Sequence, residues 1–405
     1  MAASGRLVVV GASLAGLRAV EAARRTGFTG PITLVGAESH LPYDRPPLSK
    51  AFLDDDPAAP AVPTFREHDV LTGELGVDVR LGTPATGLDA ARQVVELGDD
   101  ELPYDAVVIA TGASARPLPG SEDLAGVHTL RTVDDALRVR TALDEGARTV
   151  VVGAGFIGSE VASSARKRGL PVTVVEALPV PLTRSVGDQM GSLLAAMHTR
   201  NGTDLRCGVG VARIDGGREL EVVLTDGTVL PADLVVVGTG AAPATGWLEG
   251  SAVPLHERDR GVVCDGTLYT GVSGVYAAGD VAHWVNDLFG QSMRLEHWTS
   301  AAEQGALAAR NALGSAPAKA YTTVPYFWSD WYDSRIQFVG VPGADEILVV
   351  ENHHERGLLA LYRRGERLVG TLTVDRPTQI MKYRRLIAQR APWDEALDYA
   401  RASSQ

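Results

Sequence analysis

The chain has 405 residues, 45% of them hydrophobic, and its 38 Lys and Arg against 50 Asp and Glu give a formal net charge of -12 at pH 7. Because a single hydrophobic core stops growing at about 250 to 300 residues, we expect two or three packed domains. The acidic balance argues against non-specific binding to nucleic acid or to anionic membranes, which needs a basic surface. No apolar run of membrane-spanning length and no convincing signal peptide is present, so we expect a cytoplasmic protein that does not bind membranes.

The cysteine and histidine content bears on the redox chemistry. Only two cysteines occur, Cys207 and Cys264, and neither belongs to a CxxC or CxxxxC pair. A disulfide framework, a cysteine-bound zinc ion and a resident iron-sulfur cluster are therefore not expected. The nine histidines show no HExxH spacing, so we predict no metal site. Any redox chemistry must then belong to a bound organic cofactor.

Residues 6–38 carry a first dinucleotide-binding pattern, in which "RLVVV" predicts a strand, "GASLAG" a turn leading into a helix, and "PITLVGAE" a second strand ending in Glu38. In such a unit the first glycine permits the sharp turn, the second lets the backbone approach a pyrophosphate, and the third lets helix and strand pack closely. Gly11 and Gly16 hold the first and third places. Ser13 holds the second, a departure that weakens this motif taken alone.

The segment "LPYDRPPLSK", residues 41–50, follows directly. Two adjacent prolines stiffen it and Lys50 closes it. A rigid segment beside a cofactor typically holds a reactive group, yet this one contains no cysteine. Further along, "YDAVVIATGA", residues 104–113, predicts an apolar strand that ends in a Thr-Gly turn.

Residues 148–176, "RTVVVGAGFIGSEVASSARKRGLPVTVVE", repeat the first pattern with Gly153, Gly155 and Gly158 in the three places and Glu176 as the acid. Two matches, each with a strand, a helix and a second strand, predict two dinucleotides, an electron donor and an electron carrier. A carboxylate at this strand end favours the free 2'-hydroxyl of NADH and repels the 2'-phosphate of NADPH.

The remaining predicted elements close the nucleotide-binding part and begin another domain. "ADLVVVGTGAAP", residues 232–243, ends in a second Thr-Gly turn, and the two turns indicate chain crossings around an inserted domain. "GVYAAGDVA", residues 274–282, predicts a strand that leads to Asp280 at a helix start, where N-H groups can hold a phosphate. An amphipathic helix is predicted over 296–313. The strand-like runs of 321–405 predict an α+β domain.

Eight motifs together carry a family resemblance: "GASLAG", "LPYDRPPLSK", "ATGA", "GAGFIGSE", "GTGAAP", "VYAAGD", "RLEHWTSAAEQG" and "PYFWSD". With them the chain resembles, over essentially its whole length, the FAD-dependent, NADH-linked ferredoxin reductases of oxygenase systems, such as putidaredoxin reductase. The resemblance implies an α/β fold with two Rossmann-like dinucleotide-binding domains, for FAD and for an inserted NAD, plus a C-terminal α+β domain. The expected boundaries are 1–113 and 243–316 for the FAD domain, 114–242 for the NAD domain, and 317–405 for the C-terminal domain.

The resemblance also implies binding residues for each cofactor. For FAD these are Gly11, Ser13, Leu14, Ala15, Gly16, Glu38, Arg45, Lys50, Thr111, Gly112, Arg131, Asp280, Glu296, His297, Trp298 and Trp328. For NADH they are Gly153, Gly155, Phe156, Ile157, Gly158, Glu160, Glu176 and Gly240. Trp331 departs from the family, where we expect a polar residue in the "WSD" segment near the electron exit.

Charge indicates which reactive group the rigid segment 41–50 supplies. Reduced flavin carries negative charge, and a lysine fixed beside it in a partly dry site stabilises that charge, so Lys50 is the candidate. A buried ammonium needs a partner, and Glu160 is the expected one. Related disulfide reductases and peroxidases place redox cysteines near the flavin, soon after the first motif, where neither cysteine of this chain stands. Electrons are therefore expected to leave one at a time to an external acceptor, a [2Fe-2S] ferredoxin.

Redox ferredoxins of this kind are acidic, and so is this protein. Docking of the ferredoxin therefore requires a local basic patch. Residues 353–390 hold nine Lys and Arg against three Asp and Glu and are the candidate, with an ordinary charged surface as the other interpretation. Two other functions stay open, an NADH oxidase-like flavoprotein and a redox-signalling flavoprotein similar to apoptosis-inducing factor. The usual redox cysteine is missing for the first, and slow NADH oxidation even with ferredoxin would favour the second.

Overall fold

The computed structural model describes residues 5–54, 62, 64–217, 219–314, 316–353 and 357–403. The chain forms two compact units. The first unit comprises Met1–Asp44, Val62–Ser114 and Ala242–Thr323, and the second comprises Arg45–Ala61, Ala115–Ala241 and Val324–Gln405. None of the helices within the described residues is both long and apolar enough to cross a membrane.

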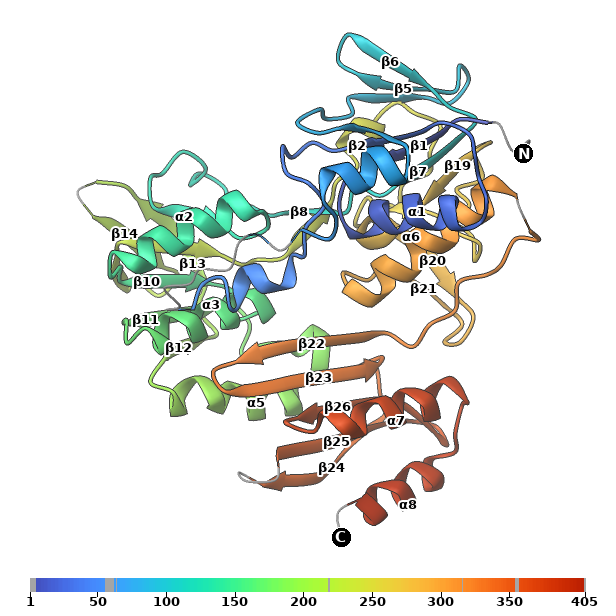
Figure 1. The fold of residues 1–405 in the computed structure, drawn as a ribbon. Coiled ribbons are helices and arrows are strands. Elements are labelled where there is room, and N and C mark those ends of the chain that lie inside the picture. The colour runs from blue at the N-terminus through green and yellow to red at the C-terminus, as the bar shows by residue number, and fades with distance from the viewer. Residues whose placement is uncertain are drawn as a thin grey trace. The chain divides into compact units, whose positions relative to one another are not determined.

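The first unit is built on a five-stranded parallel sheet with the order β19-β7-β1-β2-β3 (Figure 1). Its strands are β1 (Leu7–Val10), β2 (Ile32–Val35), β3 (Val77–Arg80), β7 (Ala106–Ile109) and β19 (Val275–Ala277). Every residue of β1 and β7 is buried, as expected for parallel strands covered on both faces. Helices α1 (Leu14–Arg25) and α6 (Trp298–Leu313), far apart in sequence, pack side by side.

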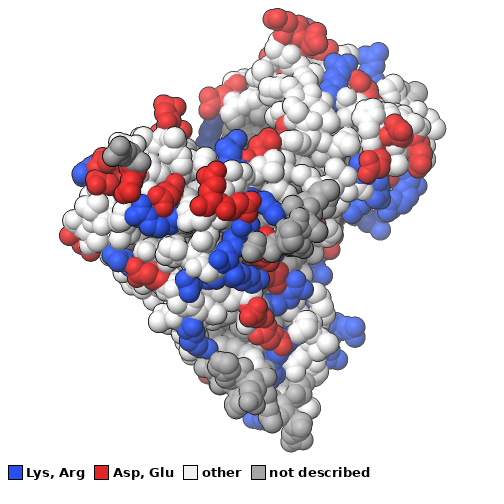
Figure 2. Space-filling view, turned by 60° about the vertical axis from the view of Figure 1, so that its left-hand side comes forward, with Lys and Arg blue, Asp and Glu red and all other residues white. Residues whose placement is uncertain are grey.

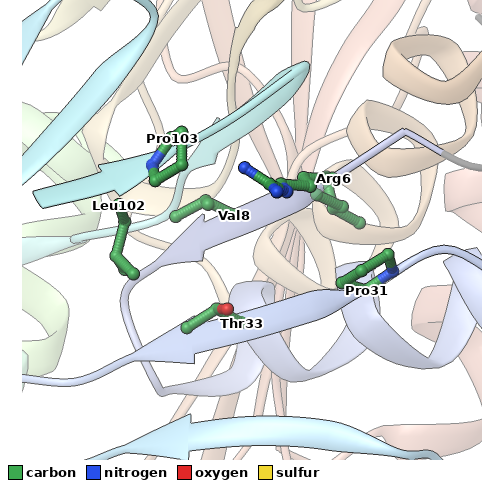
Figure 3. A pocket seen from close by; sticks show the side chains of 7 residues that line it. Arg6, Val8, Pro31, Thr33, Leu102 and Pro103 are labelled. Carbon is green, nitrogen blue, oxygen red and sulfur yellow. The ribbon is translucent and has the colours of Figure 1, made fainter.

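Smaller elements complete the first unit. An antiparallel sheet contains β4 (Gly87–Asp89), β5 (Val94–Leu97) and β6 (Asp100–Pro103), and another sheet contains β18 (Val262–Val263), β20 (Ala282–Asn286) and β21 (Gln291–Met293). Single turns are the π-helix Val70–Glu74 and the 3-10 helices Gly246–Leu248 and Gly279–Val281. A hollow lined by residues of β1, β2 and β6, among them Val8, Thr33 and Leu102, contains none of the candidate cofactor-binding residues (Figure 3).

The second unit contains another parallel sheet, of order β12-β11-β10-β16-β9. Its strands are β9 (Val127–Thr129), β10 (Thr149–Val152), β11 (Val172–Glu176), β12 (Asp204–Cys207) and β16 (Leu234–Val237). The helices are α2 (Val133–Asp144), α3 (Phe156–Lys167), α4 (Thr183–Val186), α5 (Asp188–Arg200) and the 3-10 turn η1 (Pro46–Ser49). An antiparallel sheet is formed by β13 (Val211–Asp215), β14 (Leu220–Leu224) and β15 (Val229–Ala232). Residues 45–54, expected with the FAD segment, pack in this unit.

The same unit holds the C-terminal α+β part. Its antiparallel sheet has the order β22-β23-β26-β25-β24. These strands are β22 (Tyr326–Trp331), β23 (Ser334–Gly340), β24 (Glu346–His353), β25 (Gly357–Arg364) and β26 (Arg367–Val374), followed by α7 (Pro377–Ala388) and α8 (Trp393–Ser403). Trp331, Phe338 and Tyr362 pack with Val186 and Met190 in one buried cluster. The fold class predicted from the sequence is confirmed.

The short strands β8 (Ala113–Ala115) and β17 (Ala241–Pro243) directly follow the two Thr-Gly turns, and the chain passes from one unit to the other within them. In the first unit Ala244 N donates to Gly112 O at 3.0 Å, and in the second unit Arg116 N donates to Gly240 O at 3.0 Å. The unit boundaries fall after Ser114 and Ala241. Each crossing is therefore anchored by a backbone hydrogen bond next to its glycine.

Local expectations differ from the structure at three places. Asp280 lies in a single 3-10 turn that runs into strand β20, because "AHWVN" carries the aromatic and β-branched residues that favour a strand. The long helix begins at Trp298, two residues later than predicted, with His297 as its N-cap. Trp331 is fully buried, so it does not form part of a surface.

Candidate dinucleotide-binding sites

Sterics require glycine at two positions, Gly11 in the turn after β1 and Gly16 in the first turn of α1. Gly11 has φ +123°, and a Cβ on it would lie 2.1 Å from Ala110 O. A Cβ on Gly16 would lie 1.9 Å from Gly11 O, so this glycine lets α1 pack against the strand end. The first and third places of the motif are therefore fixed by sterics within the protein.

Ser13, in the second place, is the N-cap of α1 and has extended backbone angles. Its side chain makes no capping hydrogen bond to the helix. The first N-H groups of α1, at Leu14, Ala15 and Gly16, belong to a helix N-terminus, which attracts anions. A serine here is small enough to leave this helix start open to a pyrophosphate.

Helix α6 adds a second side to this cradle. A Cβ on Gly305 would lie 2.0 Å from Ala15 O, which shows how closely α6 approaches α1. The Gly279 N-H donates to Gln304 Oε1 at 2.8 Å. Gln304 Nε2 is buried and has no hydrogen-bond partner among the described residues. A buried donor in this position fits an acceptor oxygen of a bound dinucleotide.

The other first-unit candidates lie around the same sheet end. Glu38, three residues beyond β2, accepts a hydrogen bond from Tyr43 OH at 2.6 Å. Thr111 Oγ1 donates to Ala244 O at 2.8 Å, and Gly112 has φ +68°. Asp280 is half-buried, and its carbonyl accepts from Arg294 Nη1 at 2.9 Å.

The residues before α6 are held by polar contacts. Glu296 pairs with Arg294 at 2.8 Å. Trp298 Nε1 donates to Asp44 Oδ1 at 2.8 Å. Burial lowers the pKa of His297 to about 4, so its ring is neutral at neutral pH. A neutral imidazole and an indole in fixed positions can border a flat aromatic ligand.

In the second unit the turn after β10 repeats the steric pattern. A Cβ on Gly153, whose φ is +102°, would lie 2.5 Å from Gly238 O, and a Cβ on Gly158 would lie 2.2 Å from Gly153 O. Gly155 differs, since the nearest atom to its Cβ would be Gly238 O at 3.9 Å. The second glycine is thus not required by the protein itself, which points to a ligand as the reason for it.

Glu176 ends β11 and is fixed across this turn. Its Oε2 accepts from Ala154 N at 2.9 Å, and its Oε1 accepts from Leu178 N at 2.9 Å. The carboxylate is therefore oriented by the glycine turn and keeps lone pairs for ribose hydroxyls. Two neighbouring side chains are apolar: the Phe156 ring lies 4.6 Å from that of Phe327, and Ile157 is 39% exposed.

Lys50 and Glu160 meet inside the second unit. Lys50 Nζ lies 2.9 Å from Glu160 Oε1, and the two side chains are 18% and 3% exposed. Ser49 Oγ donates to Glu160 Oε2 at 2.5 Å, and Ser329 Oγ donates to Oε1. Glu160 is buried in α3 with three donors, which is the arrangement that makes a buried carboxylate tolerable.

Ser49, Ser329 and Gln304 are residues that sequence reasoning missed. Each lies in a motif that carried the family resemblance, "LPYDRPPLSK", "PYFWSD" and "RLEHWTSAAEQG". Trp331 Nε1 donates to Ser329 Oγ at 2.9 Å, so the tryptophan that departs from the family orients a partner of Glu160. Hydroxyl and amide partners of this kind leave no signal in spacing or hydrophobic pattern.

The remaining candidates in the second unit are Arg45, Arg131, Trp328 and Gly240. Arg45 Nη1 donates to Arg131 O at 2.8 Å, and Arg131 N donates to Asp135 Oδ2 at 3.0 Å. Trp328, in β22, stacks with Tyr326 at a ring distance of 5.8 Å. Gly240 has φ +106° and open space where a Cβ would stand.

Two basic residues of the segment 353–390 form ion pairs within the protein. Residues 354–356 lie outside the described residues. Arg363 contacts Glu346 and Glu366, and Arg376 contacts Glu351. On the face shown in Figure 2, Lys and Arg lie interspersed with Asp and Glu.

A buried histidine network lies beside α3. His198 Nδ1 is 2.7 Å from Tyr332 OH, and its Nε2 is 3.2 Å from Ser159 Oγ. Tyr332 OH also lies 2.8 Å from Thr203 Oγ1. Burial lowers the pKa of His198 to about 4.

His198 should make stability fall in mild acid. Below pH 6.5 the unfolded chain protonates this histidine, whereas the folded chain keeps it neutral down to about pH 4. Stability is therefore lost as pH falls through this window, by about 2 kcal/mol between pH 7 and pH 5. His198→Gln should flatten the pH dependence of thermal unfolding by this amount. His68→Gln, at a side chain that is 60% exposed, should leave it unchanged. An unaltered slope in His198→Gln would show that the ring is protonated in the fold.

Two glycine turns, each with a helix N-terminus and an acid at or shortly after the following strand end, define an oxidoreductase class that holds two dinucleotides. The pattern of the pyridine nucleotide-disulphide oxidoreductase family matches residues 5–305, and that of the reductase C-terminal domain matches residues 326–402. The chain therefore belongs to the pyridine nucleotide-disulphide oxidoreductase family.

Individual relatives narrow this further. The chain is 35% identical over 395 residues to the ferredoxin-NAD(+) reductase component of the p-cumate 2,3-dioxygenase system of Pseudomonas putida, with 96% of this chain and 94% of the relative covered. It is 38% identical over 378 residues to a rubredoxin-NAD(+) reductase of Pseudomonas putida, with 92% and 96% covered. A chain in the crystal structure of the covalent putidaredoxin reductase-putidaredoxin complex matches with a TM-score of 0.90 at 31% identity, covering 96% and 94%. The family resemblance predicted from the motifs is confirmed.

Proposed function

We propose that this protein is an FAD-dependent NADH:ferredoxin oxidoreductase. It takes a hydride from NADH and passes the electrons, one at a time, to a [2Fe-2S] ferredoxin that supplies an oxygenase. The observation that carries the proposal is the pair of glycine-turn cradles, one in each unit, combined with Lys50 instead of a cysteine in the rigid segment 41–50. The similarity to ferredoxin reductases supports a ferredoxin as the electron acceptor.

The first-unit cradle would hold FAD. The N-terminus of α1 would bind the pyrophosphate, Glu38 a ribose, and Asp280 the sugar chain. The buried Gln304 amide supplies a further donor. FAD, when bound, supplies the step from two-electron to one-electron chemistry.

The second-unit cradle would hold NADH. Gly155 leaves room for the pyrophosphate, and Glu176, oriented by Ala154 and Leu178, would accept hydrogen bonds from the adenine ribose. The same carboxylate would repel a 2'-phosphate, so NADH is preferred over NADPH.

Lys50 would stabilise the negative charge of the reduced cofactor, and Glu160 would position Lys50. Ser49 and Ser329 hold the carboxylate of Glu160 from two sides. The pair therefore orients and neutralises, and it is not expected to form covalent bonds.

Domain limits, docking and location belong to the same proposal. The crossings after Ser114 and Ala241 support an NAD domain over 114–242, flanked by FAD segments 1–113 and 243–316, with a C-terminal domain over 317–405. The partner would dock on basic residues that the fold leaves exposed, such as Lys382 and Arg385 of α7. The protein would act in the cytoplasm.

An anaerobic stopped-flow experiment tests the function. Mixing with NADH should bleach the flavin absorbance rapidly, mixing with NADPH should do so at least about tenfold more slowly, and a second mix with a [2Fe-2S] ferredoxin should restore it. Rubredoxin serves as the comparison acceptor, because one relative is a rubredoxin reductase.

Three outcomes would contradict parts of the proposal. Reoxidation by rubredoxin but not by ferredoxin would change the acceptor. Reoxidation by dioxygen alone would favour an NADH oxidase. Slow bleaching by NADH, unaltered by either iron protein, would favour a redox-signalling flavoprotein.

A further inference from the structure

Two histidines and an aspartate meet in the first unit, in residues to which the proposed function gives no role. His256 and Asp259 lie in the turn between Leu255 and β18, and His283 lies in β20. One ligand atom from each of the three side chains lies within 4.8 Å of the other two. The cluster lies entirely within Ala242–Thr323, so it is a feature of one unit.

The turn that carries the first two residues is closed by its own backbone. His256 N donates to Gly261 O at 2.8 Å, and Arg260 N donates to His256 O at 2.9 Å. Asp259 Oδ1 accepts from Gly261 N at 3.1 Å. Because the turn is closed, His256 and Asp259 are held on the same side of it.

The ring nitrogens and the carboxylate face one another. His256 Nδ1 lies 3.0 Å from Asp259 Oδ1, and His283 Nε2 lies 4.0 Å from Asp259 Oδ2. The two rings stack with centroids 4.0 Å apart and an angle of 12°. The ligand atoms of a tetrahedral zinc site lie about 3.3 Å apart, since each bond is about 2.0 to 2.2 Å long. Because the rings are stacked, side-chain rotations that tilt the two ring planes toward each other are needed to bring all three atoms onto one ion.

Two observations indicate that the ring nitrogens of His256 and His283 are available to coordinate an ion. His256 Nδ1 is buried and, despite its short distance to Asp259, has no hydrogen-bond partner among the described residues. His283 Nδ1 lies 2.7 Å from Ser292 Oγ, which can accept a hydrogen bond from the ring Nδ1-H and leave the Nε2 lone pair facing the cluster. Metal-binding histidines are typically held in this way by a partner at the other nitrogen.

Arg294 completes the surroundings. Its Nε donates to Asp259 Oδ2 at 2.8 Å, which orients the carboxylate and leaves Oδ1 toward His256. Glu296 pairs with Arg294 at 2.8 Å. Asp259 and Glu296 therefore offset the positive charge of Arg294 beside the cluster.

We propose that His256, Asp259 and His283 bind a divalent transition-metal ion of the Zn2+ type. Two imidazole nitrogens and one carboxylate oxygen are a ligand set that Zn2+ accepts, with water in the fourth position. His256 and Asp259 are 34% and 26% exposed, so an ion can enter from solvent. The ion would tie the 256–261 turn to β20 and stabilise the first unit. The site stands independently of the proposed electron transfer.

Zn2+ titration of the metal-free holoenzyme, by calorimetry and equilibrium dialysis, tests the site. The wild-type protein should bind one Zn2+ per chain, and its unfolding temperature should rise with Zn2+. His256→Gln and His283→Gln should each weaken binding at least about tenfold, and Ser292→Ala should weaken it about tenfold. His68→Gln is the matched control, since the His68 side chain is 60% exposed and does not belong to a group of possible metal ligands among the described residues.

The proposal is overturned if the wild-type protein binds no Zn2+, or if the bound Zn2+ is unaffected by His256→Gln and His283→Gln. FAD content and NADH-driven dye reduction should be unchanged in all variants and serve as the check of folding. If one histidine variant fails to fold, Ser292→Ala still decides, because it leaves all three ligands in place. Unchanged Zn2+ affinity in Ser292→Ala would contradict the assignment of His283 Nε2 as a ligand.

Discussion

Replacing Glu160 by leucine should cost about 3 to 5 kcal/mol of unfolding free energy. The substitution leaves the Lys50 ammonium, which is 18% exposed, without its anion and deprives the Ser49 and Ser329 hydroxyls of their acceptor. The double variant Lys50→Met/Glu160→Leu should recover most of this loss, because an apolar pair can replace a buried ion pair of similar volume. Denaturant unfolding of the three proteins measures the effect.

Rate measurements separate the stabilising role of this pair from its functional role. If Lys50 and Glu160 act as proposed, the double variant should fold but bleach its flavin with NADH about 100-fold more slowly. Asp233→Asn is the control for the stability measurement, since Arg148 and Asp233 form an exposed pair at 2.9 Å. It should lower the free energy of unfolding by less than about 1 kcal/mol. Wild-type bleaching rates in the double variant would refute the role in hydride transfer.

The glycines of the second cradle should respond in opposite ways to alanine. Gly158→Ala places a Cβ 2.2 Å from Gly153 O and 3.0 Å from Val151 Cγ1, so α3 must move away from β10 at a cost of about 1 to 3 kcal/mol or more. Gly155→Ala meets nothing closer than 3.9 Å and should leave stability within about 0.5 kcal/mol. If NADH binds as proposed, the substitution should nevertheless raise KM for NADH about tenfold, because the methyl group would stand where the pyrophosphate approaches.

Thermal unfolding and steady-state kinetics at varied NADH check this pair. FAD content should be unchanged in Gly155→Ala, since the FAD cradle belongs to the other unit. Gly73→Ala, at a position with open space, should alter neither property. A wild-type KM for NADH in Gly155→Ala would mean that the second glycine does not face the cofactor.

Motif positions were predictable because backbone sterics act locally. Gly16 and Gly158 are dictated by the approach of a helix to the preceding strand end, at Gly11 O and Gly153 O, which is encoded within about ten residues of sequence. Gly11 and Gly153 have positive φ and face the backbone of a strand that is distant in the sequence, at Ala110 O and Gly238 O. The acid at Glu176 follows from the strand that carries it. Asp280 lies in a three-residue 3-10 turn and not in a longer helix, because a glycine after a strand predicts a turn but not the element that follows it.

The interaction partners of buried side chains were much harder to predict from the sequence. Lys50 and Glu160 could be paired in advance only by the rule that a buried charge needs an opposite charge. Nothing in the spacing identified Ser329 as a second partner, because it comes from a strand 169 residues away from Glu160. Trp331 was expected near a surface, and its burial depends on packing between β22 and helices α4 and α5.

The sequence by itself determined the class of this protein: two dinucleotide cradles, the acids that follow them and the absence of redox cysteines from the rigid segment are all local patterns. Tertiary structure decided which polar atoms meet. The Glu160 cluster and the His256, Asp259 and His283 cluster each join segments that are distant in the chain. Such contacts depend on the register of strands and the packing of helices, which no short stretch of sequence contains.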